Sequence, residues 1–359
     1  MKIAFWTGYS PAFPAYVRVD ENFEINEGWG SESSLTHLSL EFFKLGHEVD
    51  IYCLMEGEVP FNSEDYDIVI VSRYLNYFLY EFSKCPNTYL WLHDVTPIGY
   101  YDYRVLPLDG QKLYSNIQNH LVKTIVLSPS HQQIMLNNYG AEVENLEIIG
   151  HGLLPPSIDI SEYEKKPGKL LWTSCWNRGL PETLEMINLL DGDKYDIELD
   201  VFGLGKDEPR TFEHYNDRKP SLRELVDNSP HTINFHEYAT DKEIEEAWAK
   251  CDIWFYPTRF TETYCISALE AQRAGCFCLT SNVGALDSTV GNRGVTINPY
   301  PHGDNYPSTM ANLLKYYLDN PEDTTPFREA GKIWADTQSM ENIAKRWIDM
   351  FEREMRTFK

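Results

Sequence analysis

Short apolar runs alternate with helical segments along most of this chain. The first run, residues 2–8 (KIAFWTG), ends in a glycine, as a buried parallel strand often does. Residues 31–45 follow with Leu35, Leu38, Phe42 and Leu45 on one helical stripe. Further strand-like runs of this half occupy residues 50–54, 67–72, 88–94 and 124–130. This alternation predicts an α/β protein with a doubly wound parallel sheet.

A polar, proline-rich stretch interrupts the alternation at residues 155–168, and the same rhythm restarts behind it. A chain of 359 residues is too long for one ordinary core, so two domains are expected. We place the first domain at residues 1–157 and the second at 158–339. The tail, 340–359, reads as an amphipathic helix with Trp347 and Phe351 on its apolar side.

Charge and cysteine content exclude several classes of protein. Lys and Arg number 31 against 55 Asp and Glu, so the net charge of −24 disfavours nucleic acid and anionic membranes as partners. The seven cysteines show no CxxC or zinc spacing, which predicts reduced thiols and no metal site. The first ten residues hold no signal-peptide core or membrane span, which favours the cytoplasm.

Residues 261–275 (TETYCISALEAQRAG) carry two carboxylates eight residues apart. The segment predicts a helix that begins near Thr263, behind an apolar strand. The unpaired N–H groups of a first helical turn suit a phosphate. Those donors would come from Thr263, Tyr264, Cys265 and Ile266. Glu262 and Glu270 would then lie about 12 Å apart along the axis, which matches the length of a nucleotide-sugar.

An ionised carboxylate can accept both hydroxyl protons of a ribose diol, and a second carboxylate can hold a sugar hydroxyl in the same way. The alternative is that Glu262 caps the helix and Glu270 is a solvated or core-edge residue. The apolar neighbours of Glu270, Ala268, Leu269 and Ala271, predict a buried carboxylate that needs a partner.

The run ETYCISALEA resembles the E-x7-E signature of retaining family-4 glycosyltransferases of the GT-B fold. Other segments resemble the family in the same order along nearly the whole chain: GWGSE (28–32), WLHD (91–94), IIGHGL (148–153), LLWTSCWNRGLPETLEMI (170–187) and LTSNVGALDSTVGNRGV (279–295). The resemblance implies two Rossmann-like domains that face each other across a cleft. It implies that residues 1–157 bind the acceptor and residues 158–339 bind the nucleotide-sugar donor. It also implies that the tail helix, 340–359, crosses back to the first domain.

The resemblance also assigns roles to single residues. Glu270 matches the carboxylate that holds the nucleotide ribose, and Glu262 the one that contacts the donor sugar. Arg178 matches the cation on the diphosphate; otherwise it forms a surface ion pair at a helix start. Gly30 matches the glycine of the phosphate-binding loop, or is a simple turn glycine. His93 matches a histidine near the reacting carbon, or has a structural role.

Some positions depart from the family pattern or match it loosely. Tyr238 lies where the family's chain passes the nucleotide base, as a backbone or stacking contact. A second diphosphate cation is missing from the segment before Arg178, and Arg259 or Lys206 could replace it. Cys265 stands where the family usually keeps a glycine, and is either a residue that narrows the pocket or a small packed thiol.

The function that the resemblance implies is a hexosyltransferase of glycan biosynthesis. It would move a sugar, with retention and without metal or cofactor, from a nucleotide diphospho-sugar to a saccharide or other hydroxyl acceptor. One alternative is a catalytically silent nucleotide-sugar or saccharide-binding protein. An NAD-dependent oxidoreductase is disfavoured because the first strand is followed by no G-x-G-x-x-G. A GT-B epimerase or phosphorylase is a further alternative, and the oligomeric state stays open.

Overall fold

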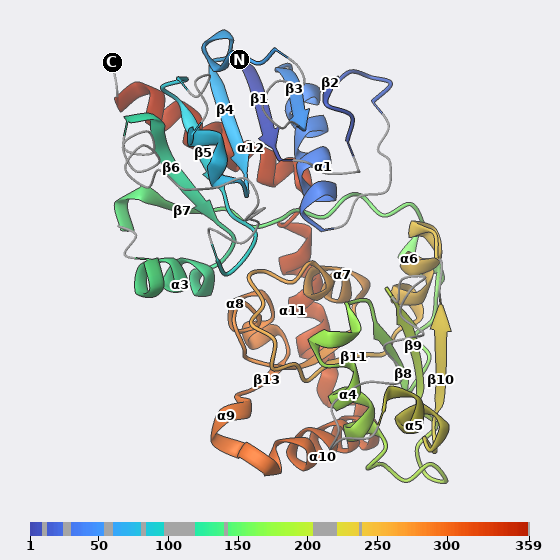
Figure 1. The fold of residues 1–359 in the computed structure, drawn as a ribbon. Coiled ribbons are helices and arrows are strands. Elements are labelled where there is room, and N and C mark those ends of the chain that lie inside the picture. Colours follow the sequence, from blue (N-terminus) through green and yellow to red (C-terminus); the bar gives the residue numbers. More distant parts are fainter. Residues whose placement is uncertain are drawn as a thin grey trace. The chain divides into compact units, whose positions relative to one another are not determined.

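The computed structural model describes residues 1–8, 13–23, 30–53, 60–79, 84–96, 119–139, 143–203, 221–236 and 239–357 (Figure 1). The chain divides into two compact units. The first comprises Met1–Leu154 together with Ser339–Lys359, and the second comprises Pro155–Gln338. The predicted roles of the two units as acceptor and donor domains, and the predicted cleft between them, stay predictions.

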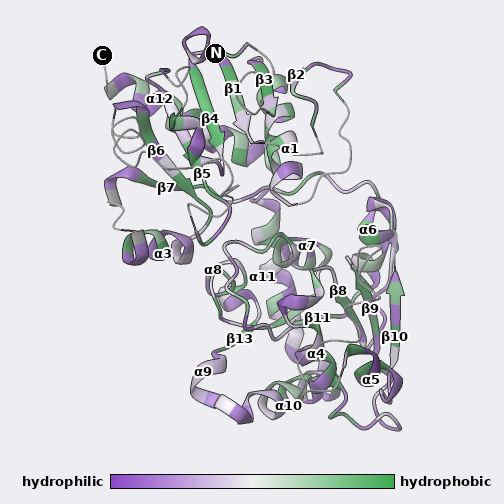
Figure 2. Ribbon diagram, in the orientation of Figure 1, coloured by the Kyte–Doolittle hydropathy of each residue, from purple (hydrophilic) through white to green (hydrophobic). Residues whose placement is uncertain are grey.

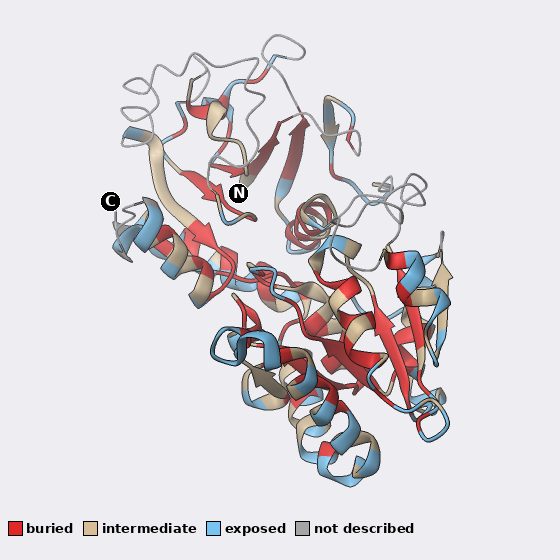
Figure 3. Ribbon diagram, turned by 60° about the horizontal axis from the view of Figure 1, so that its bottom comes forward, coloured by how far each residue is buried: buried red, intermediate tan, exposed pale blue. Residues whose placement is uncertain are grey.

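The first unit is built on a seven-stranded sheet in the order β2-β3-β1-β4-β5-β6-β7. Its strands are β1 (Lys2–Thr7), β2 (Tyr16–Arg18), β3 (Glu48–Cys53), β4 (Ile68–Ser72), β5 (Thr88–Trp91), β6 (Leu121–Val126) and β7 (Leu146–Ile148). Neighbouring strands are parallel except β2, which pairs antiparallel with β3. The central strands are hydrophobic along their length and buried, because helices cover both faces of such a sheet (Figures 2 and 3).

Among its described residues, the helices of this unit are α1 (Ser31–Lys44), α3 (Pro129–Tyr139) and α12 (Met340–Thr357). The last of these comes from the end of the chain and packs along α1. Its Trp347 and Phe351 are fully buried. The Trp347 ring meets Trp91 edge-on at 5.4 Å, and the Phe351 ring lies 4.8 Å from Tyr89, so α12 completes the core of the first unit.

The start of α12 lies against the segment where the first unit ends. Leu153 pairs with Ser339, and the Met340 N–H donates to the Leu153 carbonyl at 2.8 Å. A Cβ on Gly152 would come within 2.5 Å of the Met340 Cα. The two stretches of chain that connect the units therefore leave the first unit side by side, and only glycine permits that approach.

The second unit contains a six-stranded parallel sheet in the order β10-β9-β8-β11-β12-β13. Its strands are β8 (Lys169–Trp172), β9 (Glu198–Phe202), β10 (Thr232–His236), β11 (Ile253–Tyr256), β12 (Phe277–Ser281) and β13 (Val295–Ile297). Its helices are α4 (Leu180–Ile187), α5 (Leu222–Asp227), α6 (Asp241–Lys250), α7 (Ile266–Ala274), α8 (Leu286–Thr289), α9 (Pro299–His302), α10 (Tyr306–Asp319) and α11 (Thr325–Asp336). Two parallel-sheet α/β units confirm the fold class that the alternation predicted.

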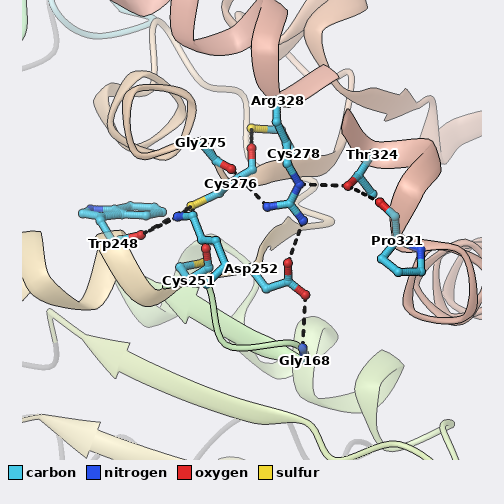
Figure 4. A network of polar contacts seen from close by, with 11 residues as sticks. Gly168, Trp248, Cys251, Asp252, Gly275, Cys276, Cys278, Pro321, Thr324 and Arg328 are labelled. Carbon is cyan, nitrogen blue, oxygen red and sulfur yellow. Dashed lines mark hydrogen bonds and ion pairs between the residues drawn. The ribbon is translucent and has the colours of Figure 1, made fainter. Parts of the chain in front are cut away.

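All seven cysteines lie within the described ranges and are free thiols. Cys276, just before β12, donates to the Cys251 carbonyl at 3.3 Å and accepts from the Lys165 ammonium at 3.5 Å. Close by, Arg328 of α11 bonds to Asp252 at 2.6 Å and to the Gly275 carbonyl at 3.0 Å (Figure 4). These contacts tie α11 to the amino ends of β11 and β12, so this group of buried thiols and half-buried charged side chains has a structural role.

Candidate active site

Glu262 lies in the loop between β11 and α7, and its side chain is buried, with 3% of the residue exposed. Nη1 of Arg178 donates to both carboxylate oxygens, each at 3.2 Å. The Tyr256 hydroxyl at the end of β11 donates to Oε1 at 2.8 Å. A buried carboxylate is costly unless it is paired and hydrogen-bonded, and these two partners meet that need.

Several contacts fix Arg178 at this position. Arg178 ends the 3-10 turn Trp176–Arg178, and Gly179, with φ 121°, turns the chain into α4. The Thr258 hydroxyl donates to the Arg178 carbonyl, and the Phe260 ring lies 4.6 Å from the guanidinium carbon. Burial is the largest influence on the pKa of Arg178 and lowers it, but Glu262 together with Tyr256, Cys175 and Cys265 more than offsets this and leaves the pKa raised.

The main chain of Glu262 is held by the loop that follows β12. Glu262 pairs with Gly284 in an isolated bridge, and the Ala285 N–H donates to the Glu262 carbonyl at 2.7 Å. Gly284 has φ 62°, and a Cβ at this position would lie 2.3 Å from the Glu262 carbonyl oxygen. Both the conformation and the close approach therefore require glycine.

The helix that carries Glu270 begins later than the sequence predicted. It starts at Ile266, not near Thr263, because Cys265 adopts a left-handed conformation with φ 73° and so ends the loop. Glu270 is thus the fifth helical residue, about 6 Å from the helix start. The expected axial separation of about 12 Å between Glu262 and Glu270 assumed a continuous helix, and it does not apply because Glu262 precedes the helix by four residues in a loop.

Glu270 is partly exposed at the surface of α7, so the expectation that it is largely buried holds only in part. The surrounding protein still removes enough water to raise the pKa of its carboxyl group, although Arg273 and the Trp248 side chain oppose this shift. The Cys265 thiol is close enough to the charged groups of the site to be affected by them. Burial and Glu262 raise the pKa of Cys265, Glu270 adds to that rise, and Arg178 opposes it. The structure therefore brings Arg178 and Glu262 into contact, with Cys265 at the N-cap of α7 and Glu270 in its second turn.

The remaining predicted donors lie around the start of α7. Tyr264 is buried and Ile266 is the first helical residue. Ser267, in the same first turn, shares a 2.9 Å hydrogen bond with Thr173, just beyond the end of β8. The carboxyl end of β8 and the amino end of α7 thus meet, which is where parallel α/β sheets bind ligands.

Arg259 is not brought to this group. Its guanidinium lies 5.1 Å from the centre of the Tyr306 ring and 3.4 Å from the Gly303 carbonyl oxygen, toward α9 and α10. The other candidate for the second cation, Lys206, lies outside the described residues, and so does Tyr238.

The two predicted residues of the first unit lie at the ends of different elements. Gly30 is the N-cap of α1 with φ 48° and ψ −92°, a conformation that favours glycine, and its carbonyl accepts from the Ser34 N–H at 3.0 Å. His93 follows β5 and is buried. Its ring stacks on His151 at 5.4 Å, and its Nε2 lies 3.2 Å from the Ser72 hydroxyl.

Burial, with His151 and Arg73 nearby, lowers the pKa of His93 well below its usual range, so its imidazole is neutral at neutral pH. A neutral imidazole can donate or accept a hydrogen bond, but it adds no charge to the first unit.

Sequence reasoning missed several residues that hold the Arg178–Glu262 pair, among them Tyr256, Phe260 and Gly284. A tyrosine at the end of the apolar run of β11 was one available signal, because a buried hydroxyl needs a partner. Gly284 lies in a segment that carried the family resemblance. The need for glycine at this position follows only from the Glu262 backbone beside it, which the sequence does not show.

Comparison with known proteins extends these observations. Residues 168–320 match the family model for glycosyl transferases group 1, a range that covers most of the second unit. No curated protein matches the chain. The second unit therefore resembles glycosyl transferases group 1 over residues 168–320.

Solved structures resemble the whole chain at low sequence identity. Sucrose-phosphate synthase from Thermosynechococcus elongatus superposes with a TM-score of 0.70 at 13% identity, over 99% of this chain and 100% of that one. Anabaena HepE, solved in complex with UDP-glucose, gives 0.66 at 12% identity over 98% and 100% of the two chains. WaaG, a glycosyltransferase involved in lipopolysaccharide biosynthesis, gives 0.63 at 17% identity over 97% and 99%.

These neighbours show that the chain has the GT-B fold, as the resemblance implied. Together with the domain match, the fold supports a glycosyltransferase. Among the described residues, no group of three or more His, Cys, Asp or Glu side chains is arranged to hold a metal ion. In the same ranges, no helix has the length and hydropathy needed to cross a membrane.

Proposed function

We propose that the chain is a retaining, metal-independent glycosyltransferase. It would move a sugar from a nucleotide diphospho-sugar to a saccharide or other hydroxyl acceptor. The observation that carries this proposal is the group formed by Arg178, Glu262 and Glu270 around the start of α7. A cation, a helix N-terminus and two carboxylates in one place are the groups that a diphosphate joined to two sugars requires.

In this proposal the diphosphate binds at the first turn of α7, beside Arg178. The unpaired N–H groups of that turn and the guanidinium charge favour an anion there. As the bond between the sugar carbon and the phosphate oxygen breaks, negative charge grows on that oxygen. Preorganised donors of this kind stabilise such charge by several kcal/mol, which lowers the barrier to transfer.

The two carboxylates have different tasks. Glu270 accepts hydroxyl protons of the nucleotide ribose, and Glu262 accepts one from the transferred sugar. The acceptor hydroxyl attacks the sugar carbon on the face that the phosphate leaves, and its proton passes to the departing phosphate oxygen. His93 and the first turn of α1 at Gly30 belong to the first unit, and we assign them to contacts with the sugar and the phosphate.

Glu270→Ala tests this assignment. A thermal-shift screen of nucleotide-sugars, beginning with UDP-sugars because HepE was solved with UDP-glucose, first identifies a donor. A hydrogen bond to a charged group contributes about 1.5–3 kcal/mol, so the variant should bind this donor about 10- to 100-fold more weakly by calorimetry. Glu185→Ala, at another partly exposed glutamate of a helix in this unit, is the control and should bind as wild type does. Unchanged affinity in Glu270→Ala would remove the ribose role.

The stereochemistry of transfer is a separate prediction. With the identified donor and a saccharide acceptor, NMR of the product should show the same anomeric configuration as the donor, in buffer that contains a metal chelator. An inverted product would contradict the same-face attack. Donor binding with neither transfer nor donor hydrolysis would instead indicate a catalytically silent binding protein.

A further inference from the structure

We propose that Tyr256 is a positioning residue of this donor site. Its hydroxyl occupies Oε1 of Glu262 and so leaves Oε2 to accept one hydroxyl of the donor sugar. This inference rests on the proposed function and deepens it, because it predicts which atom of Glu262 the sugar meets. It starts from the hydrogen bonds that surround the Glu262 carboxylate.

The Tyr256 ring cannot follow the carboxylate if the carboxylate moves. Tyr256 is buried at the end of β11, the strand that pairs with both β8 and β12. Its ring stacks on Trp254 at 5.1 Å with planes 11° apart, and Trp172 packs against it at 5.0 Å. A ring held by strand and neighbours in this way presents its hydroxyl at one fixed point, 2.8 Å from Oε1 of Glu262.

The two carboxylate oxygens of Glu262 accept different numbers of hydrogen bonds. Each oxygen of an ionised carboxylate accepts about two hydrogen bonds. Oε1 accepts from the Tyr256 hydroxyl at 2.8 Å and from Nη1 of Arg178 at 3.2 Å, so both of its sites are filled. Oε2 accepts from the same Nη1 at 3.2 Å, and among the described residues it has no second donor. One site therefore remains, which suits a single sugar hydroxyl and not a diol.

The hydroxyl stays a donor throughout the working pH range. Burial and the adjacent Glu262 charge raise the pKa of Tyr256 well above its usual value, so the phenol keeps its proton. Without this donor, Arg178 alone would hold the Glu262 carboxylate. The carboxylate would then be free to rotate about its end, and its open acceptor site would no longer be fixed toward the sugar.

The test compares two ligands in one variant. Tyr256→Phe keeps the ring and removes the hydroxyl. It should bind the identified nucleotide-sugar about 5- to 20-fold more weakly by calorimetry, a smaller loss than for a direct hydrogen bond between a charged group and the ligand, because the hydroxyl acts on the sugar only through Glu262. The matching nucleoside diphosphate, which lacks the sugar, should bind within about 2-fold of wild type, because Arg178 and α7 are unchanged.

Two controls separate positioning from a general loss of structure. Tyr195→Phe makes the same substitution in the core of the same unit, where the hydroxyl donates to the Asp319 carboxylate at 2.9 Å. This variant should bind both ligands as wild type does. In a Glu262→Gln background, Tyr256→Phe should weaken nucleotide-sugar binding no further, since its effect passes through the Glu262 carboxylate.

Each outcome decides between the proposals. If Tyr256→Phe weakens both ligands alike, weakens neither, or adds its full effect to that of Glu262→Gln, the positioning role is overturned while the proposed function stands. If wild-type protein binds no nucleotide-sugar, the proposed function fails and this inference fails with it.

Discussion

The backbone of Glu262 is held in place by a residue without a side chain. Gly284 combines a positive φ of 62° with a contact in which any Cβ would lie 2.3 Å from the Glu262 carbonyl oxygen. Real Cβ atoms do not approach a carbonyl so closely, so a side chain at 284 must displace the Glu262 loop. The position of Glu262 relative to Arg178 therefore depends on Gly284, although Gly284 contacts the backbone of Glu262 and not its carboxylate.

Gly284→Ala should lower the free energy of unfolding by about 2 kcal/mol or more, because steric overlap adds to the cost of about 1–2 kcal/mol for a left-handed residue. Gly46→Ala is the control, since Gly46 has a positive φ of 87° but open space around its Cβ. Urea unfolding measures both variants, and calorimetry should show weaker donor binding for Gly284→Ala only. Equal behaviour of the two variants would contradict the role of the close contact.

The backbone conformation of Cys265 explains why the family usually has a glycine at this position. The family resemblance places a glycine here, and the structure gives Cys265 a left-handed φ of 73° at the N-cap of α7. A non-glycine residue in this conformation costs roughly 1–2 kcal/mol. The backbone requirement, not the thiol, accounts for the usual glycine.

Among the elements, α7 was predicted as a helix but with the wrong start. The run from residue 263 onward has helical composition, yet Glu262 pairs with Gly284 and the chain turns at Cys265 before α7 begins. Local propensity is a weak signal beside such long-range contacts, since packing often overrides it. The site therefore consists of a loop and a helix start rather than two turns of one helix.

Helix α12 shows how a distant element completes a core. Its apolar stripe was readable from the sequence, because Trp347 and Phe351 recur at helical spacing. The partners of that stripe, Trp91 and Tyr89 of β5 and Phe42 of α1, lie more than 250 residues earlier in the chain. Amphipathic spacing reveals that a face is buried, but it does not reveal against what.

At the scale of the whole molecule, buried histidines make the first unit sensitive to acid. His131 accepts the Leu127 N–H at Nδ1, at 3.2 Å, and its Nε2 lies 3.0 Å from the Asp94 carbonyl oxygen. Protonation of Nδ1 would break the first bond. Burial lowers the pKa of His131 to about 4 and that of His151 to about 3, while the unfolded chain takes up these protons near pH 6.5.

The unfolded state therefore binds more protons than the folded state between pH 6.5 and about 4, and stability must fall as the pH falls through that window. Each such histidine contributes up to about 1.4 kcal/mol per pH unit. Urea unfolding at pH 7.5, 6 and 5 should show this loss. His131→Gln should show a shallower loss than wild type, and a free energy of unfolding that is constant from pH 7.5 to 5 would contradict the argument.

Much of the fold was predictable because its signals are local. Buried parallel strands need continuous apolar runs, so a run such as Ile68–Val71 could be predicted as a strand from the sequence. The proline-rich stretch near 155 indicated the boundary between two domains with this pattern. The candidate charges, Arg178, Glu262 and Glu270, were also readable, because a short ordered set of motifs carried them.

The sequence by itself determined the element types, the two α/β units and the chemical groups offered to a ligand, since these depend on residue type and spacing over a few turns. Only the tertiary structure decided which groups meet. Arg178 and Glu262 are 84 residues apart in the chain, and Glu262 depends on Gly284 from a third segment. Such contacts arise where the carboxyl ends of neighbouring strands converge, and strand order is set by packing across the whole sheet rather than by any one segment.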